Sequence, residues 1–305
     1  MLKVFTVRPF TLLSLILACL LITMVWICSD SKYVRGRNEV STMWFIESGN
    51  HNFLNFRQAC SIESAALHNP GIPIRLLTTS TLSPDCKYAK ILEALPNFRA
   101  ELLEISSAFH STPMDSWYRS NAWADSTHKT EHISDALRYT ILWRHGGIYM
   151  DLDVIMLKPL NGLTNCVVMM DKNRPNNNIM IFDKDHRFVT ALMDNCVKGY
   201  NPDDYNTCGP GLLQQMYEDG GSLSTDMSFL RKETFLAIDI ERSGWFFDRD
   251  RTASVFKEVR ESYGVHIYNS QTKNRTFDIG SGCAYELLAI MNCPRAYEAL
   301  SSSYT

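Results

Sequence analysis

The sequence lacks several features that mark familiar protein classes. Its 305 residues carry a formal charge of only −3, and no stripe of basic side chains runs along any segment. Proteins that bind nucleic acid need such a stripe to meet the phosphate backbone, so we expect no nucleic-acid partner. Internal repeats, low-complexity tracts and a long proline- or glycine-rich linker are also missing. The chain is therefore an ordinary globular protein with one large domain or two modest ones.

Zinc-site spacing is missing too. The chain has nine cysteines, but none forms a CxxC pair and no Cys/His grouping has the spacing of a structural zinc site. Two of the nine lie in an apolar N-terminal run. In an oxidising compartment some of the others would pair, but their number is odd, so at least one stays free or pairs between chains. These others are Cys60, Cys86, Cys166, Cys196, Cys208, Cys283 and Cys293.

Charge is absent from residues 10–28. A helix of that length rises ~28 Å, which is close to the ~30 Å hydrocarbon core of a bilayer. A cleaved signal peptide is the competing interpretation, but its apolar region is usually about 7–15 residues long. Basic residues flank the run on both sides, so the positive-inside rule does not settle its orientation. We expect a tail (residues 1–9), a transmembrane signal-anchor (10–28), a short stem (29–41) and one lumenal domain (42–305).

Beyond the anchor, apolar strands alternate with helices. Residues 42–47, 72–79 and 100–106 have the pattern of buried strands, and residues 55–70 and 88–95 have the pattern of helices between them. Such alternation predicts an α/β fold with a parallel sheet covered on both faces. A further helix over residues 131–145 is followed by two glycines that can end it in the left-handed conformation.

Two aspartates then interrupt an apolar run, RHGGIYMDLDVIMLKPL, at residues 144–160. Burying an ionised carboxylate without a partner is costly, so Asp151 and Asp153 either face water or share a cation. With a period of two, both point with Tyr149 to one side of a strand, near its carboxyl end. Open parallel sheets bind ligands at that edge. Paired carboxylates there suit Mg²⁺ or Mn²⁺, ions that usually hold substrate phosphates as well.

Two enzyme classes use such an Asp-x-Asp pair. Phosphatases of the haloacid-dehalogenase type place it on the first strand and need later acidic motifs, whereas here three strands precede it. In nucleotide-sugar transferases the cation bridges the donor's diphosphate, and polar groups bind the sugar hydroxyls. Asp135 and Arg138, one helical turn apart, have the chemistry for that second role. A solvated ion pair is their alternative interpretation.

The surrounding sequence is similar to that of a known family. Residues 134–160, SDALRYTILWRHGGIYMDLDVIMLKPL, resemble the DXD segment of the α1,4-glycosyltransferase family. Five further blocks resemble the family in the same order, so that the likeness extends over residues 43–300. These blocks are CSIESAALHNP, TPMDSWY, GPGLLQQM, GVHIYNS and NCPRAYEAL.

This resemblance implies a GT-A-type fold, with a Rossmann-like, mostly parallel sheet and helices on both faces. It also implies a single-pass type II protein of the Golgi membrane with a lumenal catalytic domain. The implied reaction is Mn²⁺- or Mg²⁺-dependent. It moves galactose or an N-acetylhexosamine from a UDP-sugar, with retention and in α1,4 linkage, to a glycolipid such as lactosylceramide. The same chemistry on a glycoprotein glycan with UDP-GlcNAc, and an inactive relative, remain open.

The resemblance also assigns roles in the metal and donor sites. Asp151 and Asp153 would bind the metal and the diphosphate, and Asp135 and Arg138 the donor hexose. Tyr149 would touch the nucleotide, although packing is an equal alternative.

Roles elsewhere are more open. His266 would be a third metal ligand, or else only a satisfied polar group. Gly209 and Gly211 flank Pro210 at a helix start whose amides can bind the diphosphate, or they form a plain turn. Asn176 aligns with an Asn-Gly pair of the family and is the candidate nucleophile, although Asn177 replaces the glycine. Asn274 begins the only N-x-S/T sequon and is the expected glycosylation site.

Overall fold

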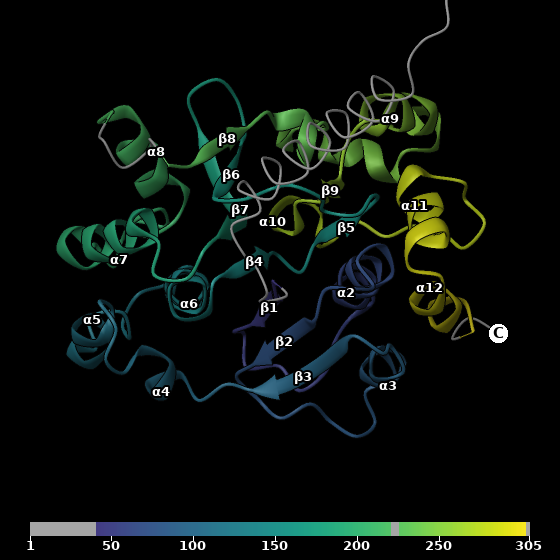
Figure 1. Ribbon diagram of the computed structural model, residues 1–305. Coiled ribbons are helices and arrows are strands. Elements are labelled where there is room, and N and C mark those ends of the chain that lie inside the picture. Colours follow the sequence, from purple (N-terminus) through teal and green to yellow (C-terminus); the bar gives the residue numbers. More distant parts are fainter. Residues whose placement is uncertain (1–40, 221–225, 303–305) are drawn as a thin grey trace, which may run out of the picture. The chain divides into compact units, whose positions relative to one another are not determined.

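A seven-stranded mixed sheet forms the centre of the fold in the computed structural model, which describes residues 41–220 and 226–302 (Figure 1). Its strand order is β3-β2-β1-β4-β7-β6-β8, and a separate pair joins β5 to β9. The strands are β1 (Met43–Glu47), β2 (Ile74–Thr78), β3 (Phe98–Leu102), β4 (Gly147–Met150), β5 (Val154–Met156), β6 (Cys166–Met169), β7 (Pro175–Phe182), β8 (Ser228–Leu230) and β9 (Gly264–His266).

Strands β3, β2, β1 and β4 run parallel, and β7 pairs antiparallel with both β4 and β6. The prediction of an α/β fold with a mostly parallel sheet is therefore confirmed. The third expected strand was placed too late along the chain, because β3 ends at Leu102 and a helix begins at Ile105. The carboxyl ends of β1, β2 and β4 meet at one edge, as the parallel register requires.

Helices cover both faces of this sheet (Figure 1). The picture shows α4 to α7 on its left and α2, α3, α11 and α12 on its right. The helices are α2 (Phe56–His68), α3 (Lys87–Glu93), α4 (Ile105–Phe109), α5 (Asp115–Ser120), α6 (Lys129–His145), α7 (Arg187–Gly199), α8 (Pro210–Glu218), α9 (Thr252–Val259), α10 (Asn269–Thr272), α11 (Ala284–Asn292) and α12 (Pro294–Ser301). Short 3-10 turns are η2 (Lys232–Thr234), η3 (Ile240–Phe247) and η4 (Arg249–Arg251).

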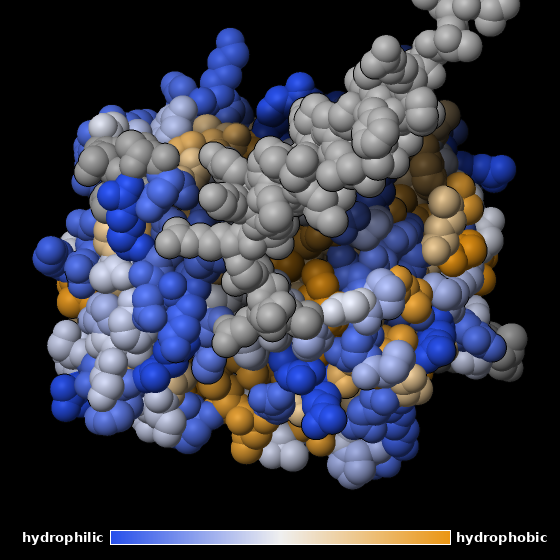
Figure 2. Space-filling view, in the orientation of Figure 1, coloured by the Kyte–Doolittle hydropathy of each residue, from blue (hydrophilic) through white to orange (hydrophobic). Residues whose placement is uncertain are grey.

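Alternate side chains of the strands enter two apolar clusters, because successive side chains of a strand point to opposite faces of the sheet. Phe45 and Met150 belong to the cluster under α2 and α11, whereas Ile46 and Tyr149 belong to the cluster under α6 and α7. The surface is mixed, and Figure 2 shows hydrophobic atoms gathered on its right-hand side, over α11.

The turn between α6 and β4 depends on its two glycines. Gly146 has φ +64° and Gly147 has φ +107°, a region in which a side chain is strained. A Cβ on Gly146 would lie 2.6 Å from the backbone nitrogen of Lys184. These glycines allow the chain to reverse directly from α6 into β4, which places α6 beside the strand that precedes the two aspartates.

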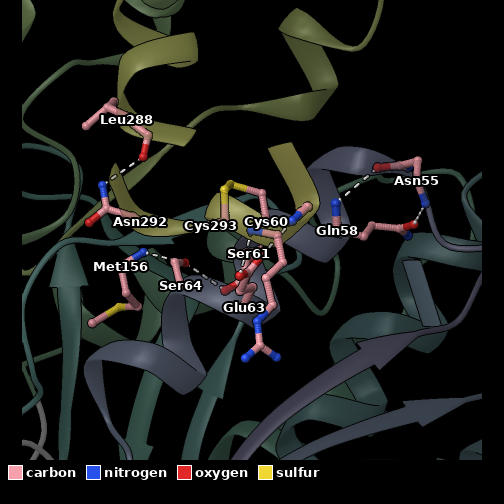
Figure 3. Close-up of a disulfide and its surroundings, with 12 residues drawn as sticks. Asn55, Gln58, Cys60, Ser61, Glu63, Ser64, Met156, Leu288, Asn292 and Cys293 are labelled. Atoms are coloured by element: carbon pink, nitrogen blue, oxygen red, sulfur yellow. Dashed lines mark hydrogen bonds between the residues drawn. A yellow bond between two sulfur atoms is a disulfide. The ribbon is translucent and has the colours of Figure 1, made fainter. Parts of the chain in front are cut away.

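Two disulfides tie distant segments together. Cys60 on α2 bonds Cys293, which lies between α11 and α12 (Figure 3). Cys196 on α7 bonds Cys208 just before α8. The remaining thiols among the described residues, those of Cys86, Cys166 and Cys283, are free and buried.

Beside the first disulfide, the buried carboxylate of Glu63 accepts the backbone N–H groups of Arg295 and Ala296 at 3.0 and 2.8 Å. This contact suits the positive end of α12. Burial raises the pKa of Glu63.

The expected tail, anchor and most of the stem lie outside the described residues. Within residues 41–220 and 226–302, no helix combines the length and the apolar character needed to cross a bilayer. The predicted membrane anchor therefore stays a prediction.

Candidate active site

Three potential metal ligands converge beyond the carboxyl end of β4. One ligand atom from each of Asp151, Asp153 and His266 lies within 4.8 Å of the others. Strand β4 ends at Met150, so the two aspartates occupy the turn that follows rather than the strand itself. The turn continues into β5, which pairs with β9 so that Val154 lies opposite His266. This pairing brings the late imidazole to the early carboxylates, where the resemblance places a third metal ligand.

Asp153 is held from three directions. Its Oδ1 lies 3.0 Å from Nε2 of His266, its Oδ2 accepts the backbone N–H of Asn269 at 2.7 Å, and its carbonyl accepts that of Ile267. Burial alone would raise the pKa of Asp153, but the nearby imidazole and these hydrogen bonds outweigh it and lower that pKa. The carboxylate raises the pKa of His266 against the opposite effect of its burial. Both shifts favour an ion pair between the ionised Asp153 and the protonated His266.

Asp151 faces Arg138 on helix α6 instead. Its Oδ1 accepts the hydroxyl of Tyr149 at 2.7 Å and lies 3.2 Å from Nη1 of Arg138. Burial raises the pKa of Asp151, Arg138 lowers it, and the neighbouring charge of Asp153 raises it, with a net rise. A cation between the two carboxylates would relieve that repulsion.

Arg138 joins the two halves of the site. Arg138 is only 6% exposed, and its guanidinium lies 3.2 Å from both Asp135 and Asp151. Its Nη1 also donates to the carbonyl of Asn177 at 2.8 Å, and its plane lies over the ring of Tyr149 at 4.5 Å. Asp135 and Arg138 are therefore buried members of one network, and the alternative of a solvated surface pair is excluded.

Asp135 has one free oxygen. Its Oδ1 accepts the side-chain amide of Asn177 at 2.8 Å and pairs with Arg138. Its Oδ2 points at Gly209, where an added Cβ would lie only 2.7 Å away. Burial raises the pKa of Asp135 to about 6, despite the opposing charge of Arg138. The missing side chain at Gly209 therefore lets the start of α8 pack against an oxygen that accepts no hydrogen bond from the described residues.

Strand β7 bulges where it passes the site. Val167 lies opposite Met180, but its neighbour Val168 lies opposite Asn176, so Asn177, Asn178 and Ile179 have no partner on β6. The Oδ1 of Asn176 accepts the backbone N–H of Asn178 at 2.8 Å. Asn177 stands where the family pattern has a glycine, and its φ is not positive. Its side chain instead binds Asp135 and the hydroxyl of Tyr139.

The other predicted residues take distinct places. Tyr149 is 2% exposed and meets the site through its hydroxyl on Asp151 and through its ring under the guanidinium of Arg138. Gly211 packs against Asn206 on the outer side of the turn and does not meet Asp135. Asn274 is exposed, as a glycan acceptor must be. The predicted nucleotide contacts of Tyr149 and Gly211 stay predictions.

Sequence reasoning missed three contributors: the amide of Asn177, the backbone N–H of Asn269, and Arg57 on α2, which binds the segment around Asn269. A run of three asparagines in an otherwise apolar strand was the available signal for the first. The other two depend on segments more than 100 residues apart in the chain, as the separation of 116 between Asn269 and Asp153 shows.

Comparison with known protein families finds two adjoining matches. Residues 55–178 match the glycosyltransferase sugar-binding region containing the DXD motif, and residues 181–300 match the alpha 1,4-glycosyltransferase conserved region. The boundary between these regions passes through β7, so Asp151 and Asp153 fall in the first and His266 in the second.

Among characterised proteins, the human alpha-1,4-N-acetylglucosaminyltransferase is 32% identical over 262 residues, covering 79% of this chain and 75% of that protein. The mouse lactosylceramide 4-alpha-galactosyltransferase is 25% identical over 271 residues, covering 85% of this chain and 76% of that protein.

Solved structures with partial likeness include the PaToxG glycosyltransferase, with a TM-score of 0.45, 21% identity and coverage of 59% of this chain and 68% of that one. The galactosyltransferase LgtC has a TM-score of 0.39, 12% identity and coverage of 83% and 96%.

Proposed function

The chain belongs to the alpha-1,4-glycosyltransferase family, and from this premise we propose that it transfers a hexose in α1,4 linkage from a UDP-sugar to a glycolipid such as lactosylceramide. As a member, it is a hexosyltransferase. The proposal adds the donor, the acceptor, the retention of α-configuration and the metal. The observation that carries it is the convergence of Asp151, Asp153 and His266 beside the buried Arg138–Asp135 pair.

The three potential metal ligands fit a divalent cation. Two carboxylates and an imidazole offer oxygen and nitrogen ligands, and the unrelieved repulsion at Asp151 is what a cation would remove. An imidazole ligand favours a first-row transition ion such as Mn²⁺ over Mg²⁺, which prefers oxygen. Asp151, Asp153 and His266 would hold this ion. When bound, it neutralises negative charge that develops on the diphosphate leaving group.

Arg138 supplies a fixed positive charge next to these ligands. Its contacts with Asp135, Asp151 and the carbonyl of Asn177 hold the guanidinium rigidly, without a cost of ordering when the donor binds. A buried guanidinium keeps its charge at all physiological pH values. Arg138 is therefore suited to orient both Asp151, which would bind the metal, and Asp135, which would bind the sugar.

Asp135 provides the acceptor for a sugar hydroxyl. Arg138 and Asn177 occupy Oδ1, and Oδ2 opens toward the missing side chain of Gly209. An ionised carboxylate accepts hydrogen bonds from hydroxyl groups and does not donate. Binding of the donor hexose at this oxygen would account for a buried carboxylate at position 135 and for a glycine at position 209.

Retention requires a covalent intermediate or attack from the face of the leaving group. Asn176 was the candidate nucleophile, but its Oδ1 accepts a backbone N–H at 2.8 Å and its side chain is buried. This contact supports front-face attack by the acceptor hydroxyl, with Asn176 shaping the bulge in β7.

A second donor and acceptor pair is favoured by one observation. The N-acetylglucosaminyltransferase relative is 32% identical to this chain, against 25% for the lactosylceramide galactosyltransferase. Transfer of N-acetylglucosamine to a glycoprotein glycan is therefore the alternative. The short stem between the apolar run and β1 would hold the site close to a Golgi membrane, which supports the glycolipid.

The test measures UDP release by the full-length chain in detergent. UDP-Gal, UDP-GalNAc and UDP-GlcNAc are each offered with lactosylceramide and with a galactose-terminated O-glycan, in Mn²⁺ or in EDTA. We expect turnover of one donor with one acceptor, its loss in EDTA, and an α1,4 product by NMR. Asp153→Ala, which removes a proposed metal ligand, should be slower by about 100-fold or more, where 100-fold is the lower end of the range for losing a preorganised electrostatic group.

The contrary results are distinct. Turnover that survives both EDTA and Asp153→Ala would contradict the metal site. A β-linked product would contradict retention. A folded wild-type protein that releases UDP from none of the three donors with either acceptor would contradict the proposed substrates.

A further inference from the structure

Arg57 lies in the first turn of α2, far from the DXD segment in sequence, and its guanidinium binds a single short segment. Nη1 donates to Oδ1 of Asn269 at 2.7 Å and to Oγ1 of Thr272 at 2.9 Å. Nη2 donates to the carbonyls of Thr272 at 2.8 Å and Arg275 at 2.6 Å. All four acceptors belong to α10 and the turn that follows it. A planar fork of donors is the side chain best suited to such a set.

Two aromatic rings fix this guanidinium in place. Its central carbon lies 5.0 Å from the ring centroid of Phe247 and 5.5 Å from that of Tyr285. Both distances are within the range of cation–π attraction. The side chain is thus a braced link from α2 to α10, and α2 is itself anchored by the Cys60–Cys293 disulfide.

The segment that Arg57 holds is the one that holds the metal ligands. The first N–H of α10, from Asn269, donates to Asp153 at 2.7 Å. His266 lies three residues earlier, with Nε2 3.0 Å from the same carboxylate.

Between them Tyr268 has φ +56° and ψ +63°, a left-handed conformation that is unfavourable for an aromatic residue. A strained residue persists only where its surroundings hold it. Four hydrogen bonds from Arg57 to the next turn supply that restraint.

We propose that Arg57 is a positioning residue for the metal site: by binding α10 it keeps the Asn269 amide and the His266 imidazole on Asp153. The inference rests on the proposed metal-dependent function. Arg57 lies outside the DXD segment, and its four hydrogen bonds go to residues 269–275 rather than to Asp151, Asp153 or His266.

The charge of Arg57 and its positioning of α10 would have opposite effects on the affinity for Mn²⁺. A positive charge near the site repels a divalent cation, so its removal would strengthen Mn²⁺ binding if charge were the main effect. Loss of positioning would weaken Mn²⁺ binding. Arg57→Lys separates the two, because lysine keeps the charge but cannot place two nitrogens on four acceptors.

The experiment measures Mn²⁺ affinity directly, from the EPR signal of free Mn²⁺ titrated with the purified full-length chain in the presence of UDP. We expect Arg57→Ala and Arg57→Lys each to weaken binding about 10-fold, the low end of the effect of groups that orient metal ligands. The Mn²⁺ concentration for half-maximal UDP release should rise in parallel, with little change in the acceptor KM. Thermal unfolding in EDTA confirms that each variant is folded.

Arg144→Ala is the matched control. Arg144 also donates to two backbone carbonyls, those of Ala108 and His110, but on α4 and the residue after it. Its loss should leave Mn²⁺ affinity unchanged. Tighter or unchanged binding in both Arg57 variants would overturn the inference. A wild-type chain that binds no Mn²⁺ would instead contradict the metal site itself, so the two failures are distinguishable.

Discussion

Arg138 and its two carboxylates depend on one another. Arg138 and Asp135 are almost fully buried and the side chain of Asp151 is 26% exposed, and an ionised group buried without a partner costs several kcal/mol. Together they form a network in which Asn177 and Tyr149 supply the remaining hydrogen bonds. Removing Arg138 would leave Asp135 and Asp151 uncompensated, so its effect on stability and its effect on donor binding cannot be separated.

Asp135 makes stability depend on pH. Its folded-state pKa of about 6 lies above the ordinary value of 3.8 because of burial. The stabilisation is therefore fully present below pH 3.8 and is lost as the pH rises through 6, by roughly 3 kcal/mol at most. Asparagine cannot ionise, so Asp135→Asn should become more stable relative to wild type between pH 4 and pH 7. Urea unfolding in EDTA at these pH values tests this, and parallel curves would contradict it.

Some single residues could be identified from the sequence and others could not. Asp151 and Asp153 were identifiable because two carboxylates in an apolar run have few physical explanations. His266 was an even choice, since only the pairing of β9 with β5 decides which groups it meets. Asn177 and Arg57 act through contacts that a bulge and a tertiary interface create, and no local pattern encodes those.

At the scale of elements, the start of α8 packs against Asp135, the proposed ligand of the donor sugar. Gly209→Ala places a Cβ 2.7 Å from Oδ2 of Asp135 and should displace that carboxylate. We expect the KM for the UDP-sugar to rise on the order of 10-fold, since about 1.4 kcal/mol corresponds to one lost hydrogen bond. Initial rates over a range of donor concentrations measure this.

Gly211→Ala is the control, because its Cβ also meets an obstacle at 2.7 Å, but that obstacle is Asn206 rather than a site residue. Both variants change the same helix start. An equal rise in KM for the two would show that α8 itself, and not the space beside Asp135, sets donor affinity.

Periodicity predicted the long elements and missed the short ones. Helix α6 and strands β1 and β2 were predicted closely because each has enough residues to show its period. Strands β5 and β9 have three residues each, too few for a pattern, yet their pairing completes the metal site. The antiparallel direction of β7 also depends on its partners and not on its own residues.

At the scale of the whole molecule, the two disulfides restrain very different lengths of chain. Cys60 and Cys293 are separated by 233 residues, and Cys196 and Cys208 by 12. Loop-closure entropy gives about 5 kcal/mol for the first and about 3 kcal/mol for the second. In urea unfolding, the double Cys→Ser variant at Cys60 and Cys293 should therefore lose more free energy of unfolding than the double variant at Cys196 and Cys208. A larger loss from the shorter loop would contradict the entropic account.

The predicted topology is also tested on the whole chain. In intact microsomes, an anchored type II protein should resist carbonate extraction and have its domain protected from added protease. Its mobility should shift by one N-glycan, and Asn274→Gln should abolish the shift. Release into the supernatant by carbonate would favour a cleaved signal peptide, and digestion without detergent would place the domain on the cytosolic side.

The pairing of β5 with β9 has a consequence for the order of synthesis. The ribosome delivers Asp151 and Asp153 well before His266, and the disulfide partner of Cys60 comes later still. A nascent chain therefore displays two adjacent carboxylates with no imidazole beside them. Full metal affinity becomes available only when the last quarter of the polypeptide has arrived and folded back, so an enzyme interrupted during translation is released without a competent site.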